Sequence, residues 1–335
     1  MNKILPDIFI QKTFTEIMKC LVSIVIICSL AACDGEGGGS VTSVSFDDRP
    51  GPFAVGQRTD VMFYDETRSR DVTATFWYPT DGENAGPEQT ANDTELVSGN
   101  REFPLIILVH GILDNAPGTW PYLAPHLASH GYIVVAPSTG SDFTNISDLE
   151  NHPGDISFLI DTAVGGNDLD DAFVNRINVD KIAIGGFSFG GAATYLIAYD
   201  PFLQDSRIKA AIMIAGIPSE APPVNPNLNL FAIYGTEDPL VSYAAGLNMF
   251  AAASAPKYLL TLRGGGHLGF TRSDETFDGA TMDQARQETL TRLAIFAYLT
   301  SLFAESDKDR AAAMQYLQAD FSQDNLDADI MFEVH

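Results

Sequence analysis

The sequence predicts an α/β fold whose mostly parallel central sheet carries helices on both faces. Short, continuously apolar runs alternate with helical segments, a pattern typical of buried parallel strands joined by helical crossovers. Two alternating segments precede these runs and predict an N-terminal antiparallel hairpin. The third observation is the stretch 181–194, K-I-A-I-G-G-F-S-F-G-G-A-A-T, which combines an apolar run, a glycine-rich turn around one serine, and a helix.

The chain has 335 residues, of which 45% are hydrophobic, so it can bury one large core. We expect one folded domain over residues 52–306 and a C-terminal extension over 307–335. The formal net charge of −25, without a Lys/Arg cluster, argues against nucleic acid and anionic membrane surfaces as ligands. We interpret the acidity as a solvated surface.

The N-terminal segment has the features of an export signal. Lys19 precedes the apolar run 21–30, which is too short to span a bilayer comfortably. The following L-A-A-C resembles the lipobox of bacterial lipoproteins. That resemblance implies a lipoprotein-type signal peptide over residues 1–33, with Cys33 lipidated as the mature N-terminus. It also implies a bacterial cell envelope location, with the protein held at a membrane by acyl chains.

The cysteines fit an exported protein without disulfides. Cys20, Cys28 and Cys33 all lie in this leader, so no disulfide is expected in the mature fold. Residues 34–51 begin with D-G-E-G-G-G-S, and we expect them to form a flexible tether.

The first predicted elements form the edge and one central strand of the sheet. Residues 59–64 and 71–78 alternate between apolar and polar positions and predict the hairpin. Residues 79–101 are rich in Gly, Asn, Asp and Glu and are typical of a long surface loop. The run P-L-I-I-L-V at 104–109 indicates a central strand that is buried on both faces.

A helix, a strand and a second helix follow. Residues 121–130 predict a helix closed by Gly131, and Y-I-V-V-A at 132–136 predicts the next strand. Residues 137–152 are polar and loop-like, and 153–163 have a helical pattern.

The C-terminal half repeats the alternation. Residues 216–229 contain four prolines, so this link is not expected to hold a long helix. The remaining elements are predicted from apolar runs and helical periodicity: strands at 208–215, 230–234 and 257–262, and helices at 243–253 and 281–303.

The glycine-rich turn predicts a nucleophilic serine. Gly186-Phe187-Ser188-Phe189-Gly190 fits G-x-S-x-G, the nucleophile elbow of the α/β-hydrolase fold. A serine on such a sharp strand-to-helix turn needs small neighbours, because the backbone is strained. The following helix begins at Ser188, so the backbone N–H of Phe189 becomes available to a developing oxyanion.

A base and an acid are expected at the ends of later strands, in the chain order Ser, Asp, His. His267 follows Gly264-Gly265-Gly266 after the last predicted strand, and we assign it as the base. Asp238 occupies the G-x-x-D position after Gly235 and is the preferred acid, with the adjacent Glu237 as a solvated carboxylate.

The remaining candidates receive other roles. His110 ends a buried strand and belongs to the loop that should supply the second oxyanion donor, the N–H of Ile112. His126 and His130 are expected on the surface of a helix. Three other acidic residues are expected to be capping or surface groups: Asp142, Asp155 and Asp161.

Several motifs together resemble the dienelactone-hydrolase superfamily. They include H-G-I-L-D-N at 110–115, G-F-S-F-G-G-A at 186–192 and G-G-G-H at 264–267. The most similar branch resembles bacterial relatives of platelet-activating-factor acetylhydrolase, with cutinase-type polyester hydrolases nearby. The resemblance implies carboxylic-ester hydrolysis without a metal or other cofactor.

We therefore expect a serine carboxylic-ester hydrolase that works through an acyl-enzyme on Ser188. The short link 216–229 leaves little room for a lid, which favours short-acyl esters in an open cleft. A polyester hydrolase, a lipase, a serine peptidase of the same fold and an inactive binding lipoprotein are the alternatives.

Overall fold

The computed structural model describes residues 44–82, 86, 88–112, 116–138, 151–165, 173–217, 225, 227–271 and 279–334. The predicted signal peptide with Cys33, most of the tether and Asp142 lie outside the described residues. Within these ranges, no helix combines the length and the apolar character that crossing a membrane requires.

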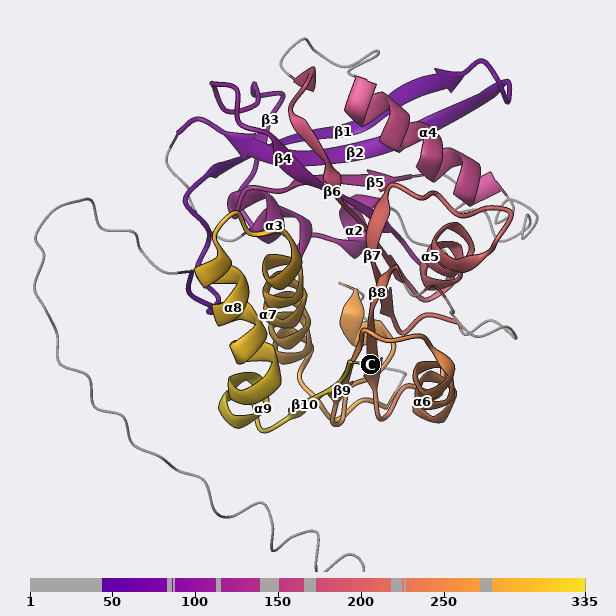
Figure 1. The fold of residues 1–335 in the computed structure, drawn as a ribbon, viewed down its shortest axis with the longest axis vertical. Helices are drawn as coiled ribbons and strands as arrows, with labels where there is room; N and C mark the ends of the chain where they lie inside the picture. Colours follow the sequence, from indigo (N-terminus) through magenta and orange to yellow (C-terminus); the bar gives the residue numbers. More distant parts are fainter. Residues whose placement is uncertain are drawn as a thin grey trace, which may run out of the picture. The chain divides into compact units, whose positions relative to one another are not determined.

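A mixed ten-stranded sheet forms the centre of this part of the chain (Figure 1). Its strand order is β10-β9-β8-β7-β6-β4-β5-β2-β1-β3. The bounds are β1 (Ala54–Asp65), β2 (Arg70–Thr80), β3 (Ala91–Asn92), β4 (Phe103–Val109), β5 (Ile133–Pro137), β6 (Ile177–Phe187), β7 (Ile208–Ile214), β8 (Asn229–Gly235), β9 (Lys257–Leu262) and β10 (Ala328–Glu333). Neighbours from β5 to β9 pair in parallel, whereas β1 and β2 form the antiparallel hairpin. The predicted sheet with its N-terminal hairpin is confirmed.

The central strands are buried on both faces of the sheet, and alternate side chains of one strand enter the two different cores. On β4, Ile106 and Leu108 belong to one apolar core, while Leu105 and Ile107 belong to the other. This is why the run 104–109 is continuously apolar.

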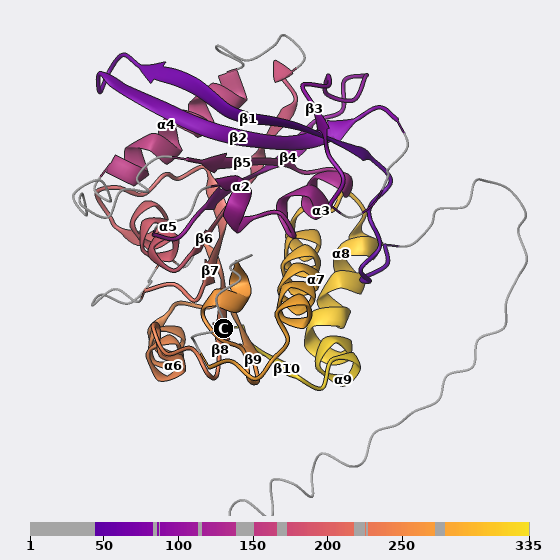
Figure 2. The ribbon, with the colours of Figure 1, turned by 180° about the vertical axis from the view of Figure 1, so that it is seen from behind.

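Helices cover the two faces, as Figures 1 and 2 show from opposite sides. Residues of α3, α7 and α9 contribute to one core, and residues of α4, α5 and α6 contribute to the other. The bounds are α2 (Ala116–Thr119), α3 (Ala124–Ser129), α4 (His152–Gly165), α5 (Phe189–Tyr199), α6 (Tyr243–Ala252), α7 (Gln284–Phe303), α8 (Asp307–Gln315) and α9 (Phe321–Asp324). The short turns η3 (Leu268–Phe270) and η4 (Tyr316–Asp320) complete these elements.

Helix α7 begins three residues later than predicted, because Asp283 caps it. The Asp283 side chain accepts a hydrogen bond from the N–H of Arg286, which satisfies one of the free donors of the first turn. Helix α3 is also shorter than predicted: it begins at Ala124 and ends before Gly131, whose φ is +92°.

Residues 307–335 contain elements that the sequence analysis did not predict. Helix α8 packs against α7, and strand β10 pairs antiparallel with β9 at the edge of the sheet. Ser43–His335 accordingly form one unit by their internal contacts.

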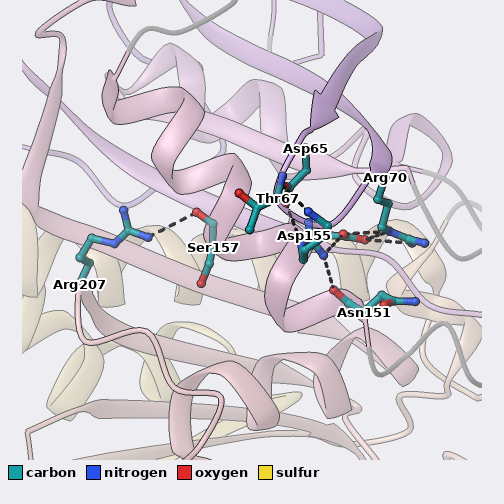
Figure 3. A network of polar contacts seen from close by, with 8 residues as sticks. Asp65, Thr67, Arg70, Asn151, Asp155, Ser157 and Arg207 are labelled. Carbon is teal, nitrogen blue, oxygen red and sulfur yellow. Dashed lines mark hydrogen bonds and ion pairs between the residues drawn. The ribbon is translucent and has the colours of Figure 1, made fainter.

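An ion-pair network joins α4 to the β1–β2 hairpin (Figure 3). Asp155 was expected to be a capping or surface group, but its carboxylate is buried. It accepts hydrogen bonds from Arg68 Nη1 at 2.7 Å and from Arg70 Nε at 3.0 Å. The reason is its position in the first turn of α4, which faces the arginines of the hairpin turn.

The expectation that His126 lies on the surface is also wrong. Its ring is fully buried, lies 5.5 Å from the ring of Phe296, and has no hydrogen-bond partner for either nitrogen among the described residues. The ring of His130 lies 4.0 Å from that of Phe296. His126 is buried and His130 half-buried because Phe296 of α7 packs against both rings.

Candidate active site

Ser188 lies at the sharp turn between β6 and α5. Its backbone has φ 53° and ψ −112°, a conformation that costs a non-glycine residue about 1–3 kcal/mol. A Cβ atom at Gly186 would lie 2.0 Å from the carbonyl oxygen of Gly190, and a Cβ at Gly190 would lie 2.2 Å from that of Val109. The turn therefore requires glycine at both positions of the motif, and it holds Ser188 at the N-cap of α5.

The structure brings Ser188, His267 and Asp238 together at the carboxyl ends of β6, β9 and β8. His267 Nε2 lies 2.9 Å from Ser188 Oγ, and His267 Nδ1 lies 2.7 Å from Asp238 Oδ2. All three residues are buried. Because a carboxylate only accepts, Nδ1 carries the ring proton and Nε2 is left to accept from the serine hydroxyl.

Both carboxylate oxygens of Asp238 are used. Oδ1 accepts hydrogen bonds from the N–H groups of Leu240 and Val241, each at 2.8 Å, and Oδ2 faces His267. These bonds fix the carboxylate plane, so the imidazole is held in one tautomer and one orientation.

The neighbouring Glu237 points elsewhere. Its Oε2 accepts hydrogen bonds from the N–H and the hydroxyl of Thr281, at 2.9 and 2.8 Å. Glu237 is exposed, as expected of a solvated carboxylate. Its bonds to Thr281 also tie the loop that follows β8 and carries Asp238, which we call the acid loop, to the segment before α7.

The Phe187 ring packs against the imidazole of His267. Its ring centroid lies 4.8 Å from that of His267, and the residue is buried. A Cβ at Gly111 would lie 2.8 Å from Cδ1 of Phe187, so the loop after β4 needs glycine where it crosses this ring. This contact of Phe187 could not be predicted from the sequence, because it exists only in the tertiary structure.

One expected oxyanion donor, Phe189, directly follows the serine, and the loop that carries the other, Ile112, passes beside it. Phe189 is the first residue of α5, and the N–H groups of a first helical turn have no acceptor within the helix. Ile112 follows Gly111, where an added Cβ would lie 3.5 Å from Cβ of Ser188. Both main-chain segments therefore border the serine side chain.

Three partly exposed apolar residues adjoin the site through their main chains, and we call them the apolar rim: Ile112 (36% exposed), Ile217 (41%) and Leu240 (60%). The N–H of Ile217 donates to the carbonyl of Ser188 at 3.2 Å, and Leu240 follows Asp238 by two residues. The sequence offered no signal for Ile217 or Leu240. Much of the link 216–229 and of the loop 137–152 lies outside the described residues.

No group of three or more His, Cys, Asp or Glu side chains is arranged to hold a metal ion in the described part of the chain. The arrangement that is present suits nucleophilic chemistry, because His267 can take the hydroxyl proton of Ser188 while Asp238 stabilises the resulting imidazolium.

Comparisons with known proteins agree with the fold described above. A family model described as "Alpha/beta hydrolase family" matches residues 106–319. Chlorophyllase-2 of Arabidopsis thaliana is 28% identical over 129 residues, which is 38% of this chain and 39% of that protein. The match thus spans well under half of the relative's length.

A solved structure of a ferulic acid esterase from Streptomyces cinnamoneus superposes with a TM-score of 0.57. The alignment covers 74% of this chain and 89% of the other at 19% sequence identity. The two proteins share a fold.

Proposed function

The chain belongs to the alpha/beta hydrolase family and has its fold, and on that premise we propose that it is a serine carboxylic-ester hydrolase. One observation carries the proposal: a continuous hydrogen-bond network joins the three side chains. Ser188 Oγ lies 2.9 Å from His267 Nε2, and His267 Nδ1 lies 2.7 Å from Asp238 Oδ2. These three residues supply a nucleophile, a general base and a group that orients the base.

The proposed reaction has two halves. Ser188 Oγ attacks the ester carbonyl as its proton passes to His267 Nε2, and the N–H groups of Phe189 and Ile112 stabilise the oxyanion. His267 then gives the proton to the leaving alcohol, which leaves an acyl group on Ser188. Water, deprotonated by His267, attacks this acyl-enzyme and releases the carboxylic acid and the free serine.

We propose short-acyl esters as substrates. The apolar rim can contact an alkyl chain beside the serine, and its burial stabilises the complex by about 25 cal/mol per Å². A similar fold in a ferulic acid esterase is compatible with an ester substrate. The motifs H-G-I at 110–112 and G-F-S-F-G at 186–190 favour an acetylhydrolase-like member of the dienelactone-hydrolase superfamily, with slow attack on exposed polyester chains as a secondary activity.

The experiment that tests this proposal is hydrolysis of p-nitrophenyl butyrate by wild type and by Ser188→Ala. Loss of the nucleophile should lower kcat by up to about 10⁶-fold, because the other members of such a triad act through it. Unchanged turnover would overturn the proposal and leave a binding protein on a hydrolase fold as the better account.

The acyl preference is tested with p-nitrophenyl esters from C4 to C16. We expect kcat/KM to fall along this series, because we propose an open, shallow site in which a long acyl chain buries little apolar surface. A rise towards C16 would instead favour a lipase.

We also propose that the mature protein is anchored to a membrane of a bacterial envelope through lipids on Cys33. The L-A-A-C sequence at 30–33 supports this proposal. Cys33→Ser should release the protein from the membrane fraction. A variant that stays with membranes as wild type does would refute the anchor without touching the proposed activity.

A further inference from the structure

Gln287 holds the residue that precedes His267. It lies in α7, its side chain is fully buried, and its amide contacts both main-chain groups of Gly266. Gly266 N–H donates to Gln287 Oε1 at 3.1 Å, and Gln287 Nε2 donates to the carbonyl oxygen of Gly266 at 2.8 Å. One side chain thus fixes the peptide units on both sides of a single residue.

Two glycines near His267 leave the space that the Gln287 amide occupies. A Cβ at Gly269 would lie 2.3 Å from Gln287 Oε1 and 2.5 Å from its Cδ, and a Cβ at Gly265 would lie 3.1 Å from Oε1. The sequence G-G-G-H-L-G therefore wraps around the Gln287 side chain. Gly265 also packs against the acid loop, because its carbonyl oxygen accepts from the N–H of Glu237 at 2.9 Å.

A second glutamine holds the other end of the same loop. Gln284, one turn earlier on α7, donates to the carbonyl oxygen of Thr271. Residues at i and i+3 share one helix face, so the two amides hold the loop at Gly266 and at Thr271. His267 lies between these two attachments.

We propose that Gln287 is a positioning residue that sets the place of the His267 imidazole. Gln287 is fully buried and acts through the main chain of Gly266 rather than on substrate. It holds His267 at hydrogen-bond distance from both Ser188 and Asp238. This inference rests on the proposed function, because the position of His267 matters only if His267 is the base.

The test compares Gln287→Met with wild type in p-nitrophenyl butyrate hydrolysis. Methionine keeps the length and approximate volume of the side chain but removes both hydrogen bonds. We expect kcat to fall by about 10²-fold, the scale of a small displacement of a catalytic group, while KM stays within about twofold. The matched control is Asn325→Leu. It removes the buried hydrogen bond that Asn325 Nδ2 donates to the carbonyl oxygen of Phe321 at the end of α9, and it should leave kcat unchanged.

The decisive measurement is the effect of Gln287→Met on the residual rate of a His267→Ala variant. A residue that acts through His267 has no further effect once that side chain is absent, so Gln287→Met should then change the residual rate by less than about twofold. An equal loss in both backgrounds would make Gln287 a general stabiliser of the fold and overturn the proposal, as would a Gln287→Met variant with wild-type kcat.

Gly269→Ala disturbs the same contact from the side of the loop, because the added Cβ would displace the Gln287 amide. It replaces Gln287→Met in the test if that variant does not fold. The φ of Gly269 lies outside the left-handed region, and the three atoms nearest an added Cβ all belong to the Gln287 amide. We expect the same loss of kcat, the same insensitivity of KM and the same absence of effect without His267. Failure of the proposed function would look different, because Ser188→Ala would then retain full turnover in this assay.

Discussion

At the scale of single residues, the site depends on which carboxylate faces His267. Asp238 and Glu237 are adjacent in sequence, yet only Asp238 reaches the imidazole, whereas Glu237 accepts hydrogen bonds from Thr281. Sequence reasoning could prefer Asp238 from the G-x-x-D spacing. It could not predict that Glu237 accepts hydrogen bonds from Thr281, which lies more than forty residues further along the chain.

Asp238→Asn should therefore lower kcat by about 10⁴-fold, because an amide that donates to the imidazole favours the wrong tautomer. Glu237→Gln is the matched control, and its loss should stay below about tenfold since it only weakens the contact with Thr281. Steady-state kinetics on p-nitrophenyl butyrate measures both. Equal losses for the two variants would contradict this assignment of the acid.

The oxyanion donors can be tested through one main-chain N–H. Ile112→Pro removes that donor and should cost roughly 3 kcal/mol of transition-state stabilisation, seen as a lower kcat. Far-UV circular dichroism establishes that the variant is folded. A folded Ile112→Pro enzyme with wild-type kcat would show that another group stabilises the oxyanion.

At the scale of elements, apolar runs predicted the buried strands well because both faces of the sheet are covered. Strand β10 escaped prediction for the opposite reason: it lies at an edge and includes exposed Asp329 and Met331. Helix α8 is polar along most of its length, and only Ala313 is buried, so it has no apolar stripe to detect. Gln287 escaped notice because a glutamine in an amphipathic helix gives no sign of what its amide contacts.

The network on α4 predicts a loss of stability that is specific to Asp155. Asp155→Asn leaves Arg68 and Arg70 without their shared carboxylate and should lower the free energy of unfolding by about 3 kcal/mol. Asp161→Asn on the same helix is the control, because the Asp161 side chain is 67% exposed and its pair with Arg207 should contribute less than about 1 kcal/mol. Urea unfolding measures both. Similar small losses would mean that the network does not fasten the hairpin to α4.

At the scale of the whole molecule, the buried His126 and the half-buried His130 make stability depend on pH. Burial holds the pKa of His126 well below its usual value, assisted by the nearby His130 and Arg292, and burial lowers the pKa of His130 to about 4. The unfolded chain therefore binds more protons than the folded one below about pH 6.5, so stability is lost as the pH falls through this range. Hydrogen bonds from Arg49 hold the pKa of Asp47 below its usual value, so its contribution is lost only in more acidic solution.

His126→Leu should flatten this dependence. Leucine removes a buried titratable group whose ring nitrogens lack partners among the described residues, so the variant should be as stable as wild type, or more stable, at pH 7. Between pH 6.5 and 5 its free energy of unfolding should fall less steeply, by up to about 1.4 kcal/mol per pH unit. Urea unfolding at several pH values tests this, and parallel curves for the two proteins would contradict it.

The central claim is that Ser188 is the nucleophile, and covalent labelling tests it most directly. Wild-type protein is treated with a fluorophosphonate, and peptide mass spectrometry locates the adduct while hydrolysis of p-nitrophenyl butyrate is followed. The account predicts one adduct, on Ser188, formed in proportion to the loss of activity, and no adduct in His267→Ala over the same time. Loss of activity with the adduct on another residue, or full activity after Ser188 is modified, would contradict it.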